Sequence, residues 1–159
     1  MSARKDQVAE ARRMRSAARL FATQALFQME ASDSSYLDVQ KEFETHRFGE
    51  DLDGDVMAEG DPDLFRTLLN TAVDRQARID QVTDQALVER WPIKRIDPTI
   101  RALFRAAAAE LIATDTPPKV VITEFVDVAK AFFPDGREAK LVNGVLDHVA
   151  RALKPDAFA

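Results

Sequence analysis

Several features that would point to a common class of protein are missing from this sequence. It contains no cysteine, which excludes a disulfide framework and thiolate chemistry and fits a reducing compartment. No uncharged apolar run approaches the roughly 18 residues of a membrane-spanning helix, and no apolar segment of a signal peptide follows the charged N-terminus. We therefore expect a soluble cytoplasmic protein with no membrane association.

Residues suited to catalysis or metal binding are also scarce. The two histidines, His46 and His148, have no partners at metal-ligand spacing, and the five glycines are too scattered for a phosphate-binding loop. The acidic run from Asp51 superficially suggests a calcium loop, but Val56 and Pro62 stand where that loop requires glycine and a bidentate glutamate. The sequence predicts no catalytic residue, no metal site and no cofactor, and a protein that is not an enzyme.

The net charge of −5 is unevenly distributed along the 159 residues. Residues 1–29 carry six basic and two acidic side chains, whereas residues 30–63 carry two basic and twelve acidic ones. Because salt screens charges over about 8–10 Å, a ligand responds to the local patch more than to the total. The acidic total therefore does not exclude nucleic-acid binding by the basic N-terminal segment.

Apolar residues recur at helical spacing over most of the chain, and an apolar content of 46% is enough for a core. Asp61-Pro62 and Asp97-Pro98 each place a capping aspartate before a proline at the first helical position. The acidic, glycine-containing segment 49–60 is typical of a loop. We predict an all-α fold of about seven helices, which span residues 4–31, 37–46, 64–75, 79–91, 98–114, 117–133 and 137–153.

The first predicted helix combines an apolar stripe with a basic face. At 100° per residue, Leu20 and Phe27 lie opposite the apolar stripe. The same side carries four arginines, which are Arg12, Arg13, Arg15 and Arg19. Guanidinium groups can fork onto phosphates and an exposed ring can stack on an unpaired base, so this face is a candidate RNA-binding surface. Alternatively, the face packs on a second bundle and the arginines form a solvated rim.

Other prominent residues have a plainer interpretation. Trp91 and Phe104 are expected in the core. Gly144 lies within the last predicted helix, where it costs roughly 1 kcal/mol of helix propensity relative to alanine. We therefore expect it to permit a close helix crossing, and Asn143 beside it to pack or to bond backbone rather than to bind a ligand.

Short motifs at both ends of the chain occur together in a recognisable order. Residues 15–28 read RSAARLFATQALFQ, in which basic residues precede a Gln-Ala-Leu-aromatic segment. The second half contains Ile96-Asp97, Leu103-Phe104-Arg105, Glu110-Leu111, Pro118-Lys119-Val120 with Glu124, and Val142-Asn143-Gly144-Val145-Leu146-Asp147. In order and spacing these motifs resemble the NusB family of bacterial RNA-binding transcription factors. The resemblance covers nearly the whole chain except about residues 31–63.

The resemblance implies a fold of two small helical bundles. We expect an N-terminal subdomain of residues 1–75 and a C-terminal subdomain of residues 76–159, packed as one compact unit. It also implies a role in processive transcription antitermination, chiefly of ribosomal RNA operons. NusB proteins pair with the ribosomal small-subunit protein NusE, and the pair binds the boxA element of nascent RNA and tethers it to RNA polymerase. The resemblance leaves open a homodimer that would cover the basic helix.

Carried over position by position, the resemblance assigns RNA contacts to the first helix. Arg15 and Arg19 match basic positions of the family, and Phe27 takes an aromatic place where tyrosine is common. Phe27 can stack on a base but has no hydroxyl to hydrogen-bond. Arg12 and Arg13 lie one turn upstream, where we expect them to compensate for the small side chains that follow Arg15.

A second set of RNA contacts is implied just before the Asn-Gly segment. Lys140 matches a basic position, and Arg137 stands where the family usually has an acidic residue, so it is expected to strengthen phosphate attraction. Leu141 replaces an aromatic residue that contacts RNA in the family. A leucine has no ring to stack on a base.

The surface for the protein partner NusE is expected on the fifth helix, around Arg101, Arg105 and Glu110, together with the preceding helix. Two other functions stay open. One is a protein-binding helical adaptor that has kept the fold but lost affinity for boxA, as Leu141 and the acidic total would allow. The other is the RNA-binding module of an rRNA methyltransferase, since such enzymes carry a NusB-like domain.

Overall fold

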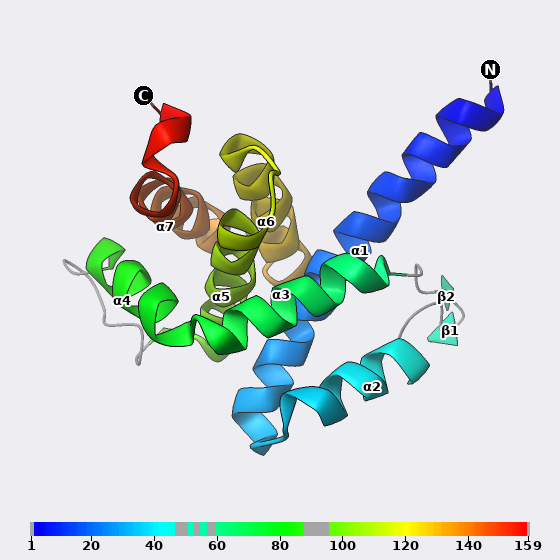
Figure 1. The fold of residues 1–159 in the computed structure, drawn as a ribbon, viewed down its shortest axis with the longest axis horizontal. Coiled ribbons are helices and arrows are strands. Elements are labelled where there is room, and N and C mark those ends of the chain that lie inside the picture. Colours follow the sequence, from blue (N-terminus) through cyan, green and yellow to red (C-terminus); the bar gives the residue numbers. More distant parts are fainter. Residues whose placement is uncertain (1, 47–50, 53–54, 57–59, 88–95, 159) are drawn as a thin grey trace.

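The chain folds into helices packed around one central helix (Figure 1). The computed structural model describes residues 2–46, 51–52, 55–56, 60–87 and 96–158. Its helices are α1 Ser2–Ser32, α2 Tyr36–His46, α3 Pro62–Asp74, α4 Gln76–Ala86, α5 Pro98–Ala113, α6 Pro118–Phe132 and α7 Arg137–Leu153, followed by the 3₁₀ turn η2 Pro155–Phe158. The predicted all-α fold of about seven helices is confirmed.

Both predicted Asp-Pro helix starts are confirmed. The Asp61 carboxylate accepts a hydrogen bond from the backbone N–H of Leu64 at 3.1 Å, and the Asp97 carboxylate accepts one from Thr99 at 2.7 Å. In each helix the proline after the aspartate occupies a position where its missing N–H has no intrahelical partner to lose. Helix α3 ends at Arg75, the single residue that separates it from α4.

Helix α5 lies at the centre of the molecule and is buried on nearly every side. It packs against α1, α3, α4, α6 and α7. Residues 106–109 are four consecutive buried alanines, whose small side chains let neighbouring helices approach from several directions. Phe104 on the same helix is fully buried, which confirms its predicted core position. Trp91 lies outside the described residues.

A smaller aromatic cluster joins α1, α2 and α3. Phe43 on α2 packs edge-on against Phe21 of α1, with ring centroids 6.3 Å apart, and stacks on Phe65 of α3 at 5.8 Å. All three rings are almost completely buried. Aromatic pairs in these geometries stabilise beyond the area they bury, by about 0.5–1.5 kcal/mol each. The cluster holds the C-terminal half of α1 in the body of the protein.

The acidic segment between α2 and α3 is only partly a loop. Two short strands, β1 Asp51–Leu52 and β2 Asp55–Val56, pair antiparallel with Asp51 opposite Val56. The expectation of a loop over 49–60 therefore missed this pairing. The rest of the segment, except Gly60, lies outside the described residues.

Helix α1 extends well beyond the helices that hold it. Residues 3–10 are all exposed, and Figure 1 shows this end of α1 projecting away from the body. No helix in the described part of the chain is long and apolar enough to cross a membrane. Because α5 packs against both α1 and α7, the division into subdomains at residue 75 stays a prediction.

Candidate nucleic-acid interface

The upstream arginines of α1 are exposed as the sequence predicts. Arg12, Arg13 and Arg15 all lie in the solvent-accessible part of the helix. Arg13 forms an ion pair with Glu10, Nη2 to Oε2 at 2.5 Å, one turn upstream. Arg12 and Arg15 make no hydrogen bond or ion pair with any other described residue. These two guanidinium groups are therefore free to bind an anion from outside.

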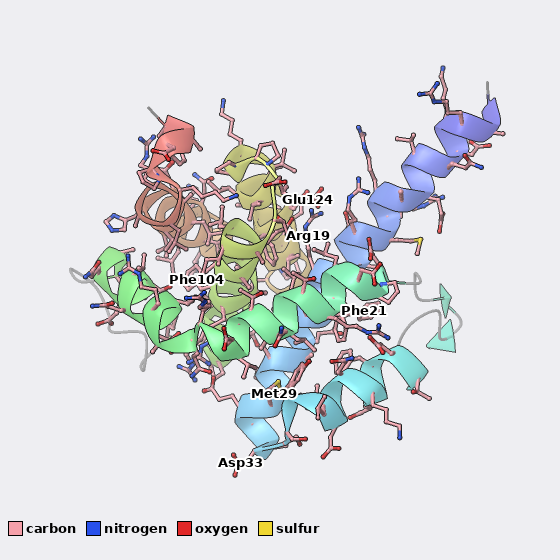
Figure 2. All side chains as sticks on the ribbon, in the orientation of Figure 1. Arg19, Phe21, Met29, Asp33, Phe104 and Glu124 are labelled. Carbon is pink, nitrogen blue, oxygen red and sulfur yellow. The ribbon has the colours of Figure 1, made fainter. Side chains whose placement is uncertain are left out.

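Arg19 does not share this exposure, and the predicted position on the open basic face was wrong for it. Its side chain is only 3% exposed and forks onto Glu110 of α5, with Nε–Oε1 and Nη2–Oε2 distances of 2.7 and 2.8 Å. A third nitrogen, Nη1, lies 3.5 Å from the Glu124 carboxylate of α6. Figure 2 shows Arg19 and Glu124 together where α1 passes α6. Arg19 holds three helices together and cannot reach a phosphate without leaving its partners.

The charge of this buried arginine is maintained by its partners. Burial alone lowers the pKa of Arg19, but the hydrogen bond and charge of Glu110, helped by the charge of Glu124, outweigh it and raise the pKa above its ordinary value. Glu110 itself is fully buried, so the expectation that it contacts a protein partner was also wrong. A single acidic residue inside the apolar 106–111 run was the sequence signal for such an internal pair, because a buried carboxylate requires a cation.

The two other positions expected to bind a partner, Arg101 and Arg105, are also engaged inside the protein. Arg105 forks onto Asp80 of α4 at 3.0 and 2.8 Å and reaches Glu30 of α1 at 3.1 Å. Arg101 also pairs with Glu30. The hydrogen bond from Arg101 is the main reason that the pKa of Glu30 lies below its ordinary value. This ion-pair cluster joins the end of α1 to α4 and α5, so a docking role for these arginines stays a prediction.

A groove of about 490 Å³ runs between α1 and α6 beside the exposed arginines. Its lining residues are Arg12, Arg13, Ser16, Ala17, Leu20, Phe21, Glu124 and Asp127. The Ser16 hydroxyl donates a hydrogen bond to Glu124 at 3.1 Å across the groove. The α1 wall is therefore basic, whereas the α6 wall is acidic.

The second predicted set of RNA contacts comes together at the start of α7. Arg137, Lys140 and Leu141 line a hollow of about 440 Å³ together with Asp135 and Gly136. Gly136 has a φ of 84°, the left-handed conformation that lets the chain turn sharply into α7. Arg137 and Lys140 are exposed and have no side-chain partner among the described residues. Leu141 is half-buried against the core.

Phe27 stands apart from both hollows. Its ring is 38% exposed, unlike the buried Phe21 on the same helix. It lines neither the groove between α1 and α6 nor the hollow at the start of α7. The ring has the surface that base stacking needs, but the structure does not place it beside the arginines.

The Asn143-Gly144 pair does not serve the packing role predicted for it. Both residues are exposed on α7, and a Cβ added at Gly144 would meet no described atom within 4 Å apart from its chain neighbours and the adjoining backbone of α7 itself. The expectation of a close helix crossing at Gly144 was therefore wrong. A glycine inside a helix costs about 0.5–1 kcal/mol relative to alanine, and no contact within the described residues offsets this cost.

Comparison with known proteins assigns the family. The model of the NusB family matches residues 16–151, which is most of the chain. The chain belongs to the NusB family. The transcription antitermination protein NusB of Agrobacterium fabrum is 42% identical to it over 144 residues, covering 90% of this chain and 87% of that protein. The NusB of Mesorhizobium japonicum is 44% identical over 141 residues, covering 88% and 90% of the two chains.

Solved structures give the same assignment. A protein chain in the crystal structure of a plectonemic RNA supercoil superposes with a TM-score of 0.71 and 27% identity, covering 86% of this chain and 94% of that one. The NusB of T. maritima superposes with a TM-score of 0.69 and 26% identity, covering 89% and 94%.

Within the described residues, no group of three or more His, Cys, Asp or Glu side chains is arranged to hold a metal ion.

Proposed function

We propose that this protein is an RNA-binding transcription antitermination factor. It binds the boxA element of nascent ribosomal RNA transcripts together with NusE and tethers that RNA to RNA polymerase. The observation that carries the proposal is the exposed, unpaired pair of cations Arg12 and Arg15, which lies immediately before the region, residues 16–151, matched by the NusB family model. The antitermination proteins similar to this chain support the assignment.

The mechanism is assembly rather than catalysis. Free guanidinium groups on α1 attract phosphates and displace counterions, which gives a salt-dependent affinity. Arg137 and Lys140 at the start of α7 offer a second cationic surface, and Phe27 offers a ring for an unpaired base. A protein partner that binds the same RNA adds its own contacts, so that the two proteins together bind the RNA more tightly than either does alone.

Arg19 contributes to this mechanism by position. Its buried pair with Glu110 fixes α1 against α5 and α6, while Arg12 and Arg15 lie one to two turns upstream on the same helix. Rigid support keeps the free arginines at fixed places, which lowers the entropy lost when they bind phosphates. Of the two arginines that match basic positions of the family, Arg19 supports the helix and Arg15 contacts the RNA.

The test is binding of a boxA RNA and of a scrambled RNA with the same composition, with and without NusE, at 50 and 200 mM salt, roughly the range over which phosphate contacts lose affinity. The proposal expects tighter binding of boxA, weakening at the higher salt, and further tightening with NusE. NusE binding with no preference for boxA would favour the helical adaptor instead. Binding of neither RNA nor NusE would contradict the proposed function.

A further inference from the structure

The groove between α1 and α6 is lined by charges of both signs that do not neutralise one another. Arg12 of α1 and Asp127 of α6 are both exposed and both line it. No ion pair joins the two side chains, and neither has a partner among the described residues. A free cation and a free carboxylate therefore border the same space, and a ligand with complementary ends would satisfy both.

The other carboxylate of the groove is already engaged. Glu124 lies three residues before Asp127, on the same side of α6. It accepts a hydrogen bond from the Ser16 hydroxyl at 3.1 Å and lies 3.5 Å from the Arg19 guanidinium. Figure 2 shows Glu124 and Arg19 together where α1 passes α6. These contacts hold the two walls of the groove in place, and they leave Asp127 as its free acceptor.

The groove has the size of a small-molecule site and an apolar surface inside it. Its volume of about 490 Å³ lies within the range of such sites, about 300–1,000 Å³. Leu20 and Ala17 of α1 also line it, and Leu20 is half-buried. A matching ligand therefore needs a flat apolar part for Leu20, an anion for Arg12 and hydrogen-bond donors for Asp127.

These three requirements together select a guanine nucleotide. Guanine has two adjacent donors on its pairing edge, N1–H and the N2 amino group, and a carboxylate can accept both at once. Adenine and cytosine have a ring-nitrogen acceptor beside the amino group, and uracil has carbonyl oxygens on both sides of its N–H. Each of these bases would turn a lone pair toward Asp127. The phosphate of the nucleotide supplies the anion for Arg12.

The acidic wall of the groove favours a free nucleotide over a nucleotide within an RNA chain. RNA carries a phosphate on every nucleotide, so a chain in the groove would bring several phosphates past Glu124 and Asp127. Like charges placed side by side weaken binding. A mononucleotide has its phosphate at one end only and can keep it at the α1 wall.

We propose that the groove between α1 and α6 binds a free guanine nucleotide. The Asp127 carboxylate accepts from N1–H and the N2 amino group, Leu20 lies against the ring, and Arg12 binds the phosphate. Because Arg12 is also one of the arginines proposed to bind boxA, the nucleotide and the RNA compete for it. Only this competition rests on the proposed function. Binding of the nucleotide itself does not require that the protein bind boxA.

The direct test is calorimetric titration of the protein with GMP, AMP and guanosine. GMP should bind at least about tenfold more tightly than either of the others, because a hydrogen bond to a charged group changes affinity by about that factor or more. AMP lacks the pair of donors and guanosine lacks the phosphate. Equal affinities for GMP and AMP, or no binding of GMP at millimolar concentration, would overturn the inference.

Asp127→Asn is the sharpest variant, because it should change the preferred base. The asparagine amide has the same size but presents one acceptor and one donor. GMP should therefore bind at least about tenfold more weakly. Xanthosine monophosphate should now be preferred, since it has a carbonyl oxygen in place of the N2 amino group. A preference for GMP that survives in this variant would contradict the role of Asp127.

Two controls accompany this variant. Asp115→Asn changes an exposed carboxylate outside the groove and should leave both affinities unchanged. Thermal unfolding of Asp127→Asn should match that of the natural protein, because Asp127 has no partner in the described structure to lose.

Arg12→Ala tests the phosphate contact. It should lower the affinity for GMP to that for guanosine and leave guanosine binding unchanged, because guanosine has no phosphate for Arg12 to bind. An Arg12→Ala protein that still binds GMP more tightly than guanosine would remove Arg12 from the site.

Two competition experiments separate the free nucleotide from RNA. A single-stranded RNA tetranucleotide with one guanosine should displace GMP no better than GMP itself does. Tighter binding of the tetranucleotide that is lost in Asp127→Asn would assign the groove to RNA and overturn the inference. Saturating GMP should raise the boxA dissociation constant. A protein that binds GMP but not boxA retains this inference while the proposed function fails, and one that binds boxA but not GMP shows the reverse.

Discussion

The two arginine-rich regions of this protein, the upstream part of α1 and the outer side of α5, put the same side chain to different uses. Arg12 and Arg15 on α1 form no ion pair with any described residue, whereas Arg101 and Arg105 on α5 are held by Glu30 and Asp80. The number of arginines in a segment therefore does not show how many can bind a ligand. What decides is whether another helix brings a carboxylate within reach.

The largest expected effect comes from breaking the internal pair of Arg19. Glu110→Ala would leave a buried guanidinium with only Glu124 at 3.5 Å, and loss of one partner of a buried pair costs about 3–5 kcal/mol of unfolding free energy. Urea denaturation measures this loss. Glu10→Gln, which removes the exposed partner of Arg13, should cost under about 0.5 kcal/mol. Equal losses in the two variants would contradict the distinction between buried and exposed arginine pairs.

A second prediction extends the comparison from arginines to phenylalanines on α1. If the exposed Phe27 ring stacks on a base, Phe27→Ala should weaken RNA binding by about 1–3 kcal/mol and leave the salt slope unchanged. The matched control is Phe21→Ala, which removes a buried ring and should cost about 3–5 kcal/mol of stability. Binding titrations and thermal unfolding of both variants are required. A Phe27→Ala protein with normal RNA affinity would remove the ring from the proposed interface.

A third prediction tests the free arginines directly. The Arg12→Ala/Arg15→Ala protein should bind boxA more weakly, and the slope of log K against log salt should fall by up to about 1.4, or 0.7 for each lost contact on single-stranded RNA. Its stability should not change, since neither residue pairs within the described chain. Arg78→Ala on α4, with a single weak contact to Gln81 at 3.4 Å, controls for loss of charge. An unchanged slope in the double variant would show that these arginines do not contact phosphate.

The smallest expected effect concerns the acid stability of the α5 region. The pKa of Glu30 is lowered in the folded protein, chiefly by its hydrogen bond from Arg101. A lowered pKa contributes stability that is present above the unfolded value of 4.5 and is lost as the pH falls through the folded value. Glu30→Gln should therefore flatten the fall in unfolding free energy below about pH 4.5. A fall as steep as in the natural protein would show that Glu30 is not its source.

The positions of the helices follow closely from local sequence. Asp61-Pro62 and Asp97-Pro98 start helices as predicted, because a capping carboxylate and a proline without an N–H act on the residues next to them. The last predicted helix, 137–153, matches α7 in full. The β1–β2 pairing was not predicted, because strands of two residues are too short to show a periodic pattern.

The candidate site was predicted only in part, and the errors have a common cause. Arg137, Lys140 and Leu141 come together as expected because they lie within one turn of a single helix. Arg19 and Gly144 were misplaced because their environment depends on other helices. Arg19 is covered by α5 and α6, whereas no neighbouring helix in the described structure reaches Gly144.

The sequence by itself determined that this protein is helical, where most of its helices begin and end, and which family it belongs to. These properties depend on interactions between residues a few positions apart, or on motifs read in order. Only the tertiary structure decided which charged groups stay free. Arg15 and Arg19 lie four residues apart on one helix, yet only Arg19 meets a carboxylate, because its partner Glu110 is 91 positions away along the chain. A helical wheel of α1 cannot show a contact with a residue on another helix. The division between structural and ligand-binding arginines therefore depends on how the helices pack.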